Sequence, residues 1–212
     1  MKALVDNDIL LKGAEYGLLS PFATVIPGKD GPVGVLGAAR YVVQDRLSRR
    51  STECSAIQEF LRFLGENIEL EPTPEEQNIA SVIESCAQRA GVDLDAGESQ
   101  LCAVLISREV PLFVTGDKRA ICAIDVLLDA YALLAAAAGR VICLEQLIWK
   151  LLETLQVEAV RKSICNKPNA DKALSICFCC KSSADASKDN ILAGITSYVE
   201  DLRTKAPRVL FP

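Results

Sequence analysis

The sequence predicts an α/β protein in which a mostly parallel sheet lies between two layers of helices. Short apolar runs alternate with amphipathic, helix-like segments along most of the 212 residues. Half of the residues are apolar and 24% are charged, a composition typical of a globular protein that buries a core. We therefore expect a three-layer α/β/α sandwich with a helical extension at its C-terminal end.

Five short apolar runs have the character of β-strands, and helical patterns separate them. The Pro- and Gly-rich stretch Pro21–Gly37 is expected to be a loop apart from the strand at its end. In chain order, the expected strands are Lys2–Val5, Val33–Leu36, Asn67–Glu71, Pro111–Thr115 and Arg140–Leu144.

The clearest helical pattern runs from Thr73 to Ala90. Thr73 is a good N-cap, Pro74 suits the first helical position, and Glu76 completes a capping box. Gly91 then provides the C-terminal stop. The other expected helices are Ile9–Leu19, Ala38–Leu47, Cys54–Leu64, Ser99–Arg108, Lys118–Ala138, Glu145–Ile164 and Asn190–Lys205.

The chain divides by composition into an α/β domain over residues 1–164 and a helical, cysteine-containing extension over residues 165–212. No apolar segment near Met1 resembles a signal peptide, and the run Ala123–Ala138 is short and interrupted by acids. We therefore expect a cytoplasmic protein without membrane contact.

The nine cysteines are an odd number and lie largely in apolar segments, so we expect them to be reduced core residues. A zinc site in the extension is the alternative. Its four candidate ligands lack paired CxxC spacing, which makes a tetrahedral site less favourable. These candidates are Cys165, Cys177, Cys179 and Cys180.

The sequence contains no histidine, which excludes Ser-His-Asp and Cys-His catalysis and every His-liganded metal. The net charge of −5 argues against broad wrapping of nucleic acid, because phosphate is neutralised by Lys and Arg. The basic cluster Arg46, Arg49 and Arg50 leaves room for a short nucleic-acid rim, or for an ordinary charged surface.

Three acids stand where expected strands end or helices begin. Asp6 directly follows the first strand, Asp117 follows the Pro111–Thr115 strand after one residue, and Glu98 lies at a helix start. The working site of an open α/β sheet lies at the carboxyl ends of its strands. Carboxylates that converge there repel each other unless a cation lies between them, and an all-oxygen site favours Mg²⁺ or Mn²⁺.

Each acid also has a structural interpretation. Asp117 is suited to capping the helix that follows it, and Glu98 suits the third position of a capping box that Asp95 begins. Asp6 is suited to a turn. The sequence leaves both interpretations open for each acid.

The residues around these acids resemble the three acidic motifs of PIN domains. The matching stretches are Leu4-Val-Asp-Asn-Asp-Ile-Leu-Leu, Leu94-Asp-Ala-Gly-Glu-Ser-Gln-Leu-Cys-Ala and Leu112-Phe-Val-Thr-Gly-Asp. Together with the last strand and helix, the resemblance covers roughly residues 1–155. It implies a PIN-like fold and a metal-dependent nuclease, mostly acting on RNA, with Asp6, Glu98 and Asp117 as catalytic metal ligands.

PIN domains usually carry another acid in the helix after the second strand, and Asp45 is the nearest candidate here. The loose fit leaves open a degenerate PIN-like protein that binds partners without cutting. Thr115, Lys118 and Arg119 flank Asp117 and are candidates for contacting a substrate phosphate, or for a solvated first helical turn.

Many PIN domains are toxins, so the resemblance implies an RNA substrate and an antitoxin or other protein partner. It leaves open whether the protein forms a homodimer. The alternative enzyme is a haloacid-dehalogenase-like phosphatase, in which Asp6 and Asp8 form a DxD pair, with Thr115 as the hydroxyl and Lys118 as the lysine. That family's later acidic pair is missing, since the last strand ends in Glu145 and Gln146.

Overall fold

The computed structural model describes residues 1–50, 54–181 and 187–212, and within them it contains one five-stranded sheet. All strand pairs are parallel, and the strand order is β3-β2-β1-β4-β5. The α/β prediction is therefore confirmed, with a sheet that is entirely parallel. The strands are β1 (Leu4–Val5), β2 (Gly34–Leu36), β3 (Ile68–Leu70), β4 (Phe113–Thr115) and β5 (Val141–Cys143).

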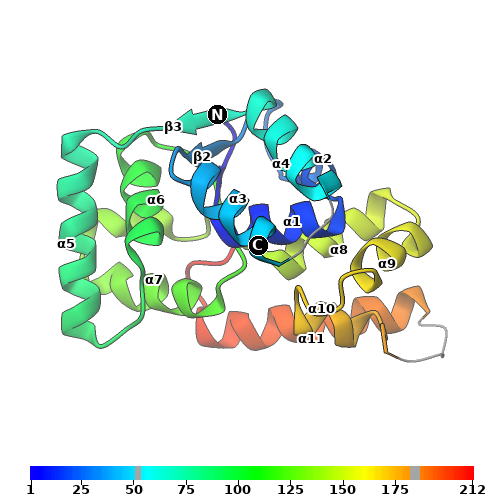
Figure 1. Cartoon of the computed structure of the whole chain (residues 1–212). Coiled ribbons are helices and arrows are strands. Elements are labelled where there is room, and N and C mark those ends of the chain that lie inside the picture. Colours follow the sequence, from blue (N-terminus) through cyan, green and yellow to red (C-terminus); the bar gives the residue numbers. More distant parts are fainter. Residues whose placement is uncertain (51–53, 182–186) are drawn as a thin grey trace.

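Helices cover both faces of the sheet (Figure 1). The buried apolar side chains form two separate cores. One face carries α1 (Asn7–Tyr16), α2 (Leu19–Val25), α3 (Ala39–Arg49), α4 (Cys54–Glu66) and α8 (Leu144–Thr154). The other face carries α5 (Pro74–Ala90), α6 (Ala96–Ser107), α7 (Lys118–Ala130) and the 3₁₀ helix η1 (Ala132–Ala137). This arrangement is consistent with the expected three-layer sandwich. None of the helices built from the described residues combines the length and apolar character needed to cross a membrane.

Strand residues alternate between the two cores, as the pleat of a buried strand requires. Leu4 and Phe113 pack with α5, α6 and α7, whereas their neighbours Val5 and Val114 pack with α1 and α8. The central strand β1 pairs with β2 on one side and β4 on the other, with Val5 opposite Val114. Because both strands run in the same direction, the residues that follow β1 and β4 meet at one edge of the sheet.

Helix α5 has both ends that its sequence predicts. Thr73 accepts the backbone N–H of Glu76 at 3.2 Å, Glu76 accepts the backbone N–H of Thr73 at 2.8 Å, and Gly91 is in the left-handed conformation. The buried Glu76 carboxylate also accepts Nε and Nη2 of Arg108, at 2.7 and 2.8 Å. Arg108 thereby ties the end of α6 to the start of α5.

We expect Glu76→Gln to lower the free energy of unfolding by about 1–3 kcal/mol, because it keeps the capping oxygen and loses the charged pair with Arg108. Hydrogen bonds from Arg108 lower the pKa of Glu76. This stabilisation is therefore present above the ordinary pKa of a glutamate and is lost as the pH falls below it. Urea unfolding at pH 7 and pH 3 measures both effects. The exposed Glu75→Gln is the control, and equal urea midpoints for the two variants at pH 7 would disprove the assignment.

The expectation that Pro21–Gly37 begins as a loop is wrong, because α2 (Leu19–Val25) runs through Pro21. Leu18 at the N-cap provides no side-chain cap, and Glu59 of α4 instead accepts the backbone N–H of Leu19 at 3.0 Å. Proline is tolerated in the first helical turn, where its missing N–H has no helical partner. The capping group comes from a distant helix and was therefore invisible in the local sequence.

Two expected long helices are each divided in two. The segment expected as Lys118–Ala138 is α7 followed by η1, and Glu145–Ile164 is α8 followed by α9 (Val157–Cys165). In both cases the apolar periodicity continues across the break, because both halves pack on the same core. Periodicity alone therefore did not show where the backbone turns.

The C-terminal segment contributes to both cores. It contains α10 (Lys172–Cys177) and α11 (Lys188–Lys205), and α11 packs on α8 and α10. Beyond α11 the chain runs beside β5, where Val141 accepts the backbone N–H of Phe211 at 2.8 Å and donates to the carbonyl of Val209 at 3.0 Å. The described residues of this C-terminal segment thus lie beside the sheet edge as well as packing on helices.

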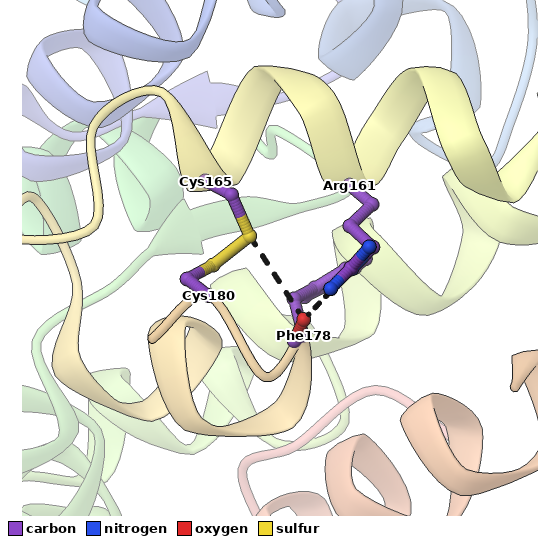
Figure 2. The surroundings of a disulfide bond; sticks show 4 residues. All are labelled: Arg161, Cys165, Phe178 and Cys180. Atoms are coloured by element: carbon purple, nitrogen blue, oxygen red, sulfur yellow. Dashed lines mark hydrogen bonds between the residues drawn. A yellow bond between two sulfur atoms is a disulfide. The ribbon is translucent and has the colours of Figure 1, made fainter. Parts of the chain in front are cut away.

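The expectation that all cysteines are reduced is wrong for Cys165 and Cys180, which form a disulfide (Figure 2). The bond joins the end of α9 to the turn after α10, where Arg161 also donates to the carbonyl of Phe178 at 3.1 Å. Counting cysteines could not show that these two α-carbons come within 4.9 Å. The disulfide also removes two of the four candidate zinc ligands in this segment.

Candidate acidic site

Asp6 lies at the mouth of β1 and is almost fully buried, with 8% of its surface exposed. It is the N-cap of α1, and its Oδ1 accepts the backbone N–H of Asn7 at 2.6 Å. Its Oδ2 accepts the hydroxyl of Thr115 at 3.0 Å. Burial raises the pKa of Asp6 to about 6, although these hydrogen bonds lower it. Asp6 is therefore both the N-cap of α1 and a buried acid at the end of a strand.

Glu98 is the third residue of α6 and is also buried, with 6% of its surface exposed. It forms the expected capping box, in which its Oε2 accepts the backbone N–H of Asp95 at 2.9 Å. Burial, together with smaller contributions from the charges of Asp95, Asp6 and Asp117, raises the pKa of Glu98 to about 8. Asp6 and Asp117 are thus each close enough to Glu98 for their charges to act on it.

Asp117 caps α7, as its sequence position predicts, and accepts the backbone N–H of Arg119 at 2.8 Å. The Arg119 guanidinium pairs with the other carboxylate oxygen at 2.8 Å. Burial alone would raise the pKa of Asp117, but the hydrogen bonds and charge of Arg119 outweigh it and lower this pKa. Of the three acids, Asp117 therefore has the lowest pKa and ionises first as the pH rises.

A pocket of about 210 Å³ opens at this edge of the sheet. Asp6 does not line this pocket, but its charge raises the pKa of Glu98, which does. Neither Asp6 nor Glu98 forms an ion pair with any residue in the described parts of the chain. The lining residues are Asp93, Leu94, Asp95, Glu98, Asp117 and Arg119.

The donor chemistry fits a hard divalent cation, since every candidate ligand is a carboxylate and two of them, Asp6 and Glu98, have no ion-pair partner in the described parts of the chain. The side chains are nevertheless apart: within residues 1–50, 54–181 and 187–212, no group of three Asp, Glu or Cys side chains is placed to hold a metal ion. A shared ion therefore requires Asp6, Glu98 and Asp117 to move closer together.

The three residues predicted to contact phosphate have different surroundings. Thr115 is fully buried. Its hydroxyl donates to Asp6 and accepts the backbone N–H of Asp117 at 3.2 Å. Thr115 therefore positions the acids, in place of the phosphate contact predicted from the sequence. Lys118 pairs with the buried Glu145 at 2.6 Å and lies over the ring of Tyr198. Arg119 is exposed in the pocket wall, where its guanidinium is accessible to a substrate phosphate as predicted from the sequence.

Asp45 does not join the other acids. It lies on the exposed face of α3, where its carboxylate accepts Nε of Arg49 at 3.0 Å, and it does not line the acidic pocket. Arg50 pairs with Glu15 at 3.0 Å. The basic cluster on α3 is therefore partly balanced by acids next to it.

Sequence reasoning missed two charged residues near this edge of the sheet, Lys12 and Asp171, and weighed Glu145 only within the phosphatase alternative. Lys12 follows Asp8 by four residues, a spacing that places both on one face of α1. Glu145 follows β5 after one residue, as Asp117 follows β4, so its place after a strand was a usable signal. Asp171 comes from a segment with no sequence pattern that points to this site.

We expect Thr115→Val to reduce the activity of this site by about 10–100-fold, because a group that orients a ligand is lost while the ligand itself remains. The hydroxyl also lowers the pKa of Asp6, so its loss raises that pKa further. The pH at which activity reaches half its maximum should therefore move upward. Thr154→Val, which removes a hydroxyl bonded to the Leu151 carbonyl on α8, is the control. An unchanged pH profile in Thr115→Val would contradict the positioning role.

Comparison of the chain with models of protein families, with curated proteins and with solved structures finds no match. Function therefore has to be inferred from the placement of these side chains and from the sequence motifs.

Proposed function

We propose that this protein is a PIN-like, Mg²⁺- or Mn²⁺-dependent ribonuclease that hydrolyses phosphodiester bonds. The observation that carries the proposal is the pair Asp6 and Glu98, two buried carboxyl groups beside the acidic pocket that have no ion-pair partner among the described residues. The parallel sheet, with Asp6 after β1 and Asp117 after β4, supports the PIN-like assignment. So does the order of the three acidic motifs along the chain.

In this proposal Asp6, Glu98 and Asp117 hold the divalent ion. When bound there, such an ion would lower the pKa of a water molecule and offset charge on the phosphate. Thr115 holds Asp6 in orientation through the 3.0 Å hydrogen bond. Arg119 presents guanidinium donors at the pocket wall, where they suit a phosphate oxygen. In contacting phosphate, Arg119 would release Asp117.

The charge of the pocket gives an independent reason for a cation. A phosphodiester is an anion, and a pocket lined by Asp93, Asp95, Glu98 and Asp117 repels it. A divalent ion would offset most of this negative charge, and Arg119 in the same pocket wall offsets a further part of it. The expected partners of a PIN-type toxin, an RNA substrate and an antitoxin or other protein, belong to the same proposal.

The phosphatase alternative has less support. It requires Asp8 and Lys118 to serve the reaction, but Asp8 pairs with Lys12 at 2.7 Å and Lys118 pairs with Glu145 at 2.6 Å. Asp8 also lies within the first turn of α1. Both side chains are thus engaged in contacts within the fold.

Cleavage of a mixed RNA tests the proposal, with Mn²⁺, Mg²⁺ or EDTA in parallel and DNA of the same sequence as a second substrate. We expect cleavage of RNA with either ion and none with EDTA. Asp6→Asn, purified in parallel, detects contaminating nucleases. Equal RNA cleavage by both proteins, or RNA binding without cleavage under every condition, would overturn the proposal.

A further inference from the structure

An apolar groove with a volume of about 400 Å³ lies between α2, α8, α11 and the segment that follows α11. Its walls include four large apolar side chains that are only partly buried. These are Val25, Trp149, Val199 and Phe211. The volume lies in the range of about 300–1,000 Å³ in which proteins bind small organic ligands. The groove shares no lining residue with the acidic pocket, so it is a separate candidate binding site.

Phe211, which forms one wall of this groove, is fixed by three hydrogen bonds. Its backbone N–H donates to the carbonyl of Val141 at 2.8 Å. Its carbonyl accepts Nε2 of Gln146 at 2.8 Å and Nη2 of Arg203 at 3.3 Å. Gln146 is fixed in turn, because its Oε1 accepts the backbone N–H of Cys143 at 3.0 Å. The wall is therefore formed before any ligand arrives, which lowers the cost of binding.

The charged side chains that line the groove are both cations, Lys150 and Arg203. Lys150 Nζ lies 3.1 Å from Glu153 and 4.9 Å from the ring centre of Trp149. Arg203 Nε lies 3.8 Å from Glu200. Neither glutamate lines the groove, and both pairs are open to solvent, where such pairs are weak. An anion in the groove can therefore replace these partners without leaving a buried charge unpaired.

We propose that this groove binds a small amphipathic anion, a medium-chain carboxylate, with its alkyl chain on Trp149 and Phe211 and its carboxylate at Lys150 and Arg203. The apolar walls favour an alkyl chain over a sugar or a nucleotide, whose polar groups need more hydrogen-bond partners. The two cations favour a carboxylate over an amine, and the guanidinium of Arg203 has the planar donor set that suits a carboxylate. The inference is independent of the proposed nuclease function, because none of the acids of the candidate site lines the groove.

Trp149 is the only tryptophan of the chain, so its fluorescence reports on this groove alone. The full chain is titrated with decanoate, below the concentration at which decanoate forms micelles. We expect saturable binding and a shift of the Trp149 emission to shorter wavelength, because the alkyl chain displaces water from the ring. Decyltrimethylammonium has an alkyl chain of the same length and the opposite charge, and it should bind at least about tenfold more weakly.

Substitutions in the wall locate the binding. Thr196 lines the groove from an exposed position of α11, and Thr196→Phe should fill the mouth and weaken decanoate binding at least about tenfold. Thr204→Phe makes the same change at an exposed position of α11 outside the groove and should bind as the wild type does. Lys150→Gln should weaken decanoate binding about fivefold, through the loss of one cation at an exposed position. Circular dichroism confirms that each variant is folded.

The absence of a saturable shift in the wild type, or equal affinities for decanoate and decyltrimethylammonium, would overturn the inference. So would decanoate binding that both Thr196→Phe and Lys150→Gln leave unchanged. A Trp149 emission that shifts with protein concentration alone would also overturn it, because a second copy of the chain would then fill the groove. Each of these outcomes leaves the nuclease proposal intact, since RNA cleavage tests that proposal separately.

Discussion

Asp6→Asn and Glu98→Gln are each expected to reduce Mn²⁺-dependent RNA cleavage by at least about 100-fold. A metal ion contributes several kcal/mol to stabilising transition-state charge, and each 1.36 kcal/mol corresponds to a factor of ten in rate. Both substitutions keep the shape of the side chain and remove its charge. Asparagine is also a good N-cap, so α1 should still begin at Asn7 in the first variant.

The matched control for this experiment is Asp45→Asn. It removes an acid of the same kind from the exposed face of α3, away from the acidic pocket. We expect it to cleave RNA at the wild-type rate. A loss in Asp45→Asn as large as in Asp6→Asn would mean that the pocket has been assigned to the wrong acids.

The metal-free protein is expected to lose several kcal/mol of stability as the pH rises from about 4 to 8. In the folded state burial raises the pKa of Asp6 to about 6 and that of Glu98 to about 8, both above their unfolded values. The folded form therefore binds these protons more tightly than the unfolded form does. Stability is highest while both acids are protonated and falls as they ionise.

Asp6→Asn and Glu98→Gln should remove this penalty. In EDTA each variant should match the wild type near pH 4 and exceed it at pH 8, by roughly 3 kcal/mol for Asp6→Asn. Mn²⁺ at 100 times its dissociation constant should stabilise the wild type at pH 8 by about 2.7 kcal/mol. Urea unfolding with EDTA or Mn²⁺ measures these differences. Variants that are less stable than the wild type at pH 8 in EDTA would show that ionisation of the two buried carboxyl groups does not destabilise the folded state.

Much of this fold follows from local sequence patterns. The five strands are short apolar runs, and helices such as α5 carry their own caps in Thr73, Glu76 and Gly91. The parallel sheet then follows from the alternation of strands and helices, and it brings Asp6 and Asp117 to one edge. Convergence of these two acids was therefore predictable without knowing any side-chain contact.

What the sequence did not show depends on contacts between distant segments. The start of α2 is capped by Glu59 of α4, and the Cys165–Cys180 bond requires two turns to meet. Likewise, Asp171 reaches Lys12 only because the C-terminal segment folds back on α1. Local patterns record what a segment can form by itself, and none of these partners is local.

The most direct test of a divalent-ion site at Asp6, Glu98 and Asp117 is a crystal structure of the protein with Mn²⁺, using the anomalous signal of the metal. We predict a peak between these three carboxylates, with oxygen contacts of about 2.1 Å, the distance typical of a small hard cation. A peak only beside Asp8 and Asp171, or carboxylates that stay apart with no peak between them in saturating Mn²⁺, would contradict the proposed site.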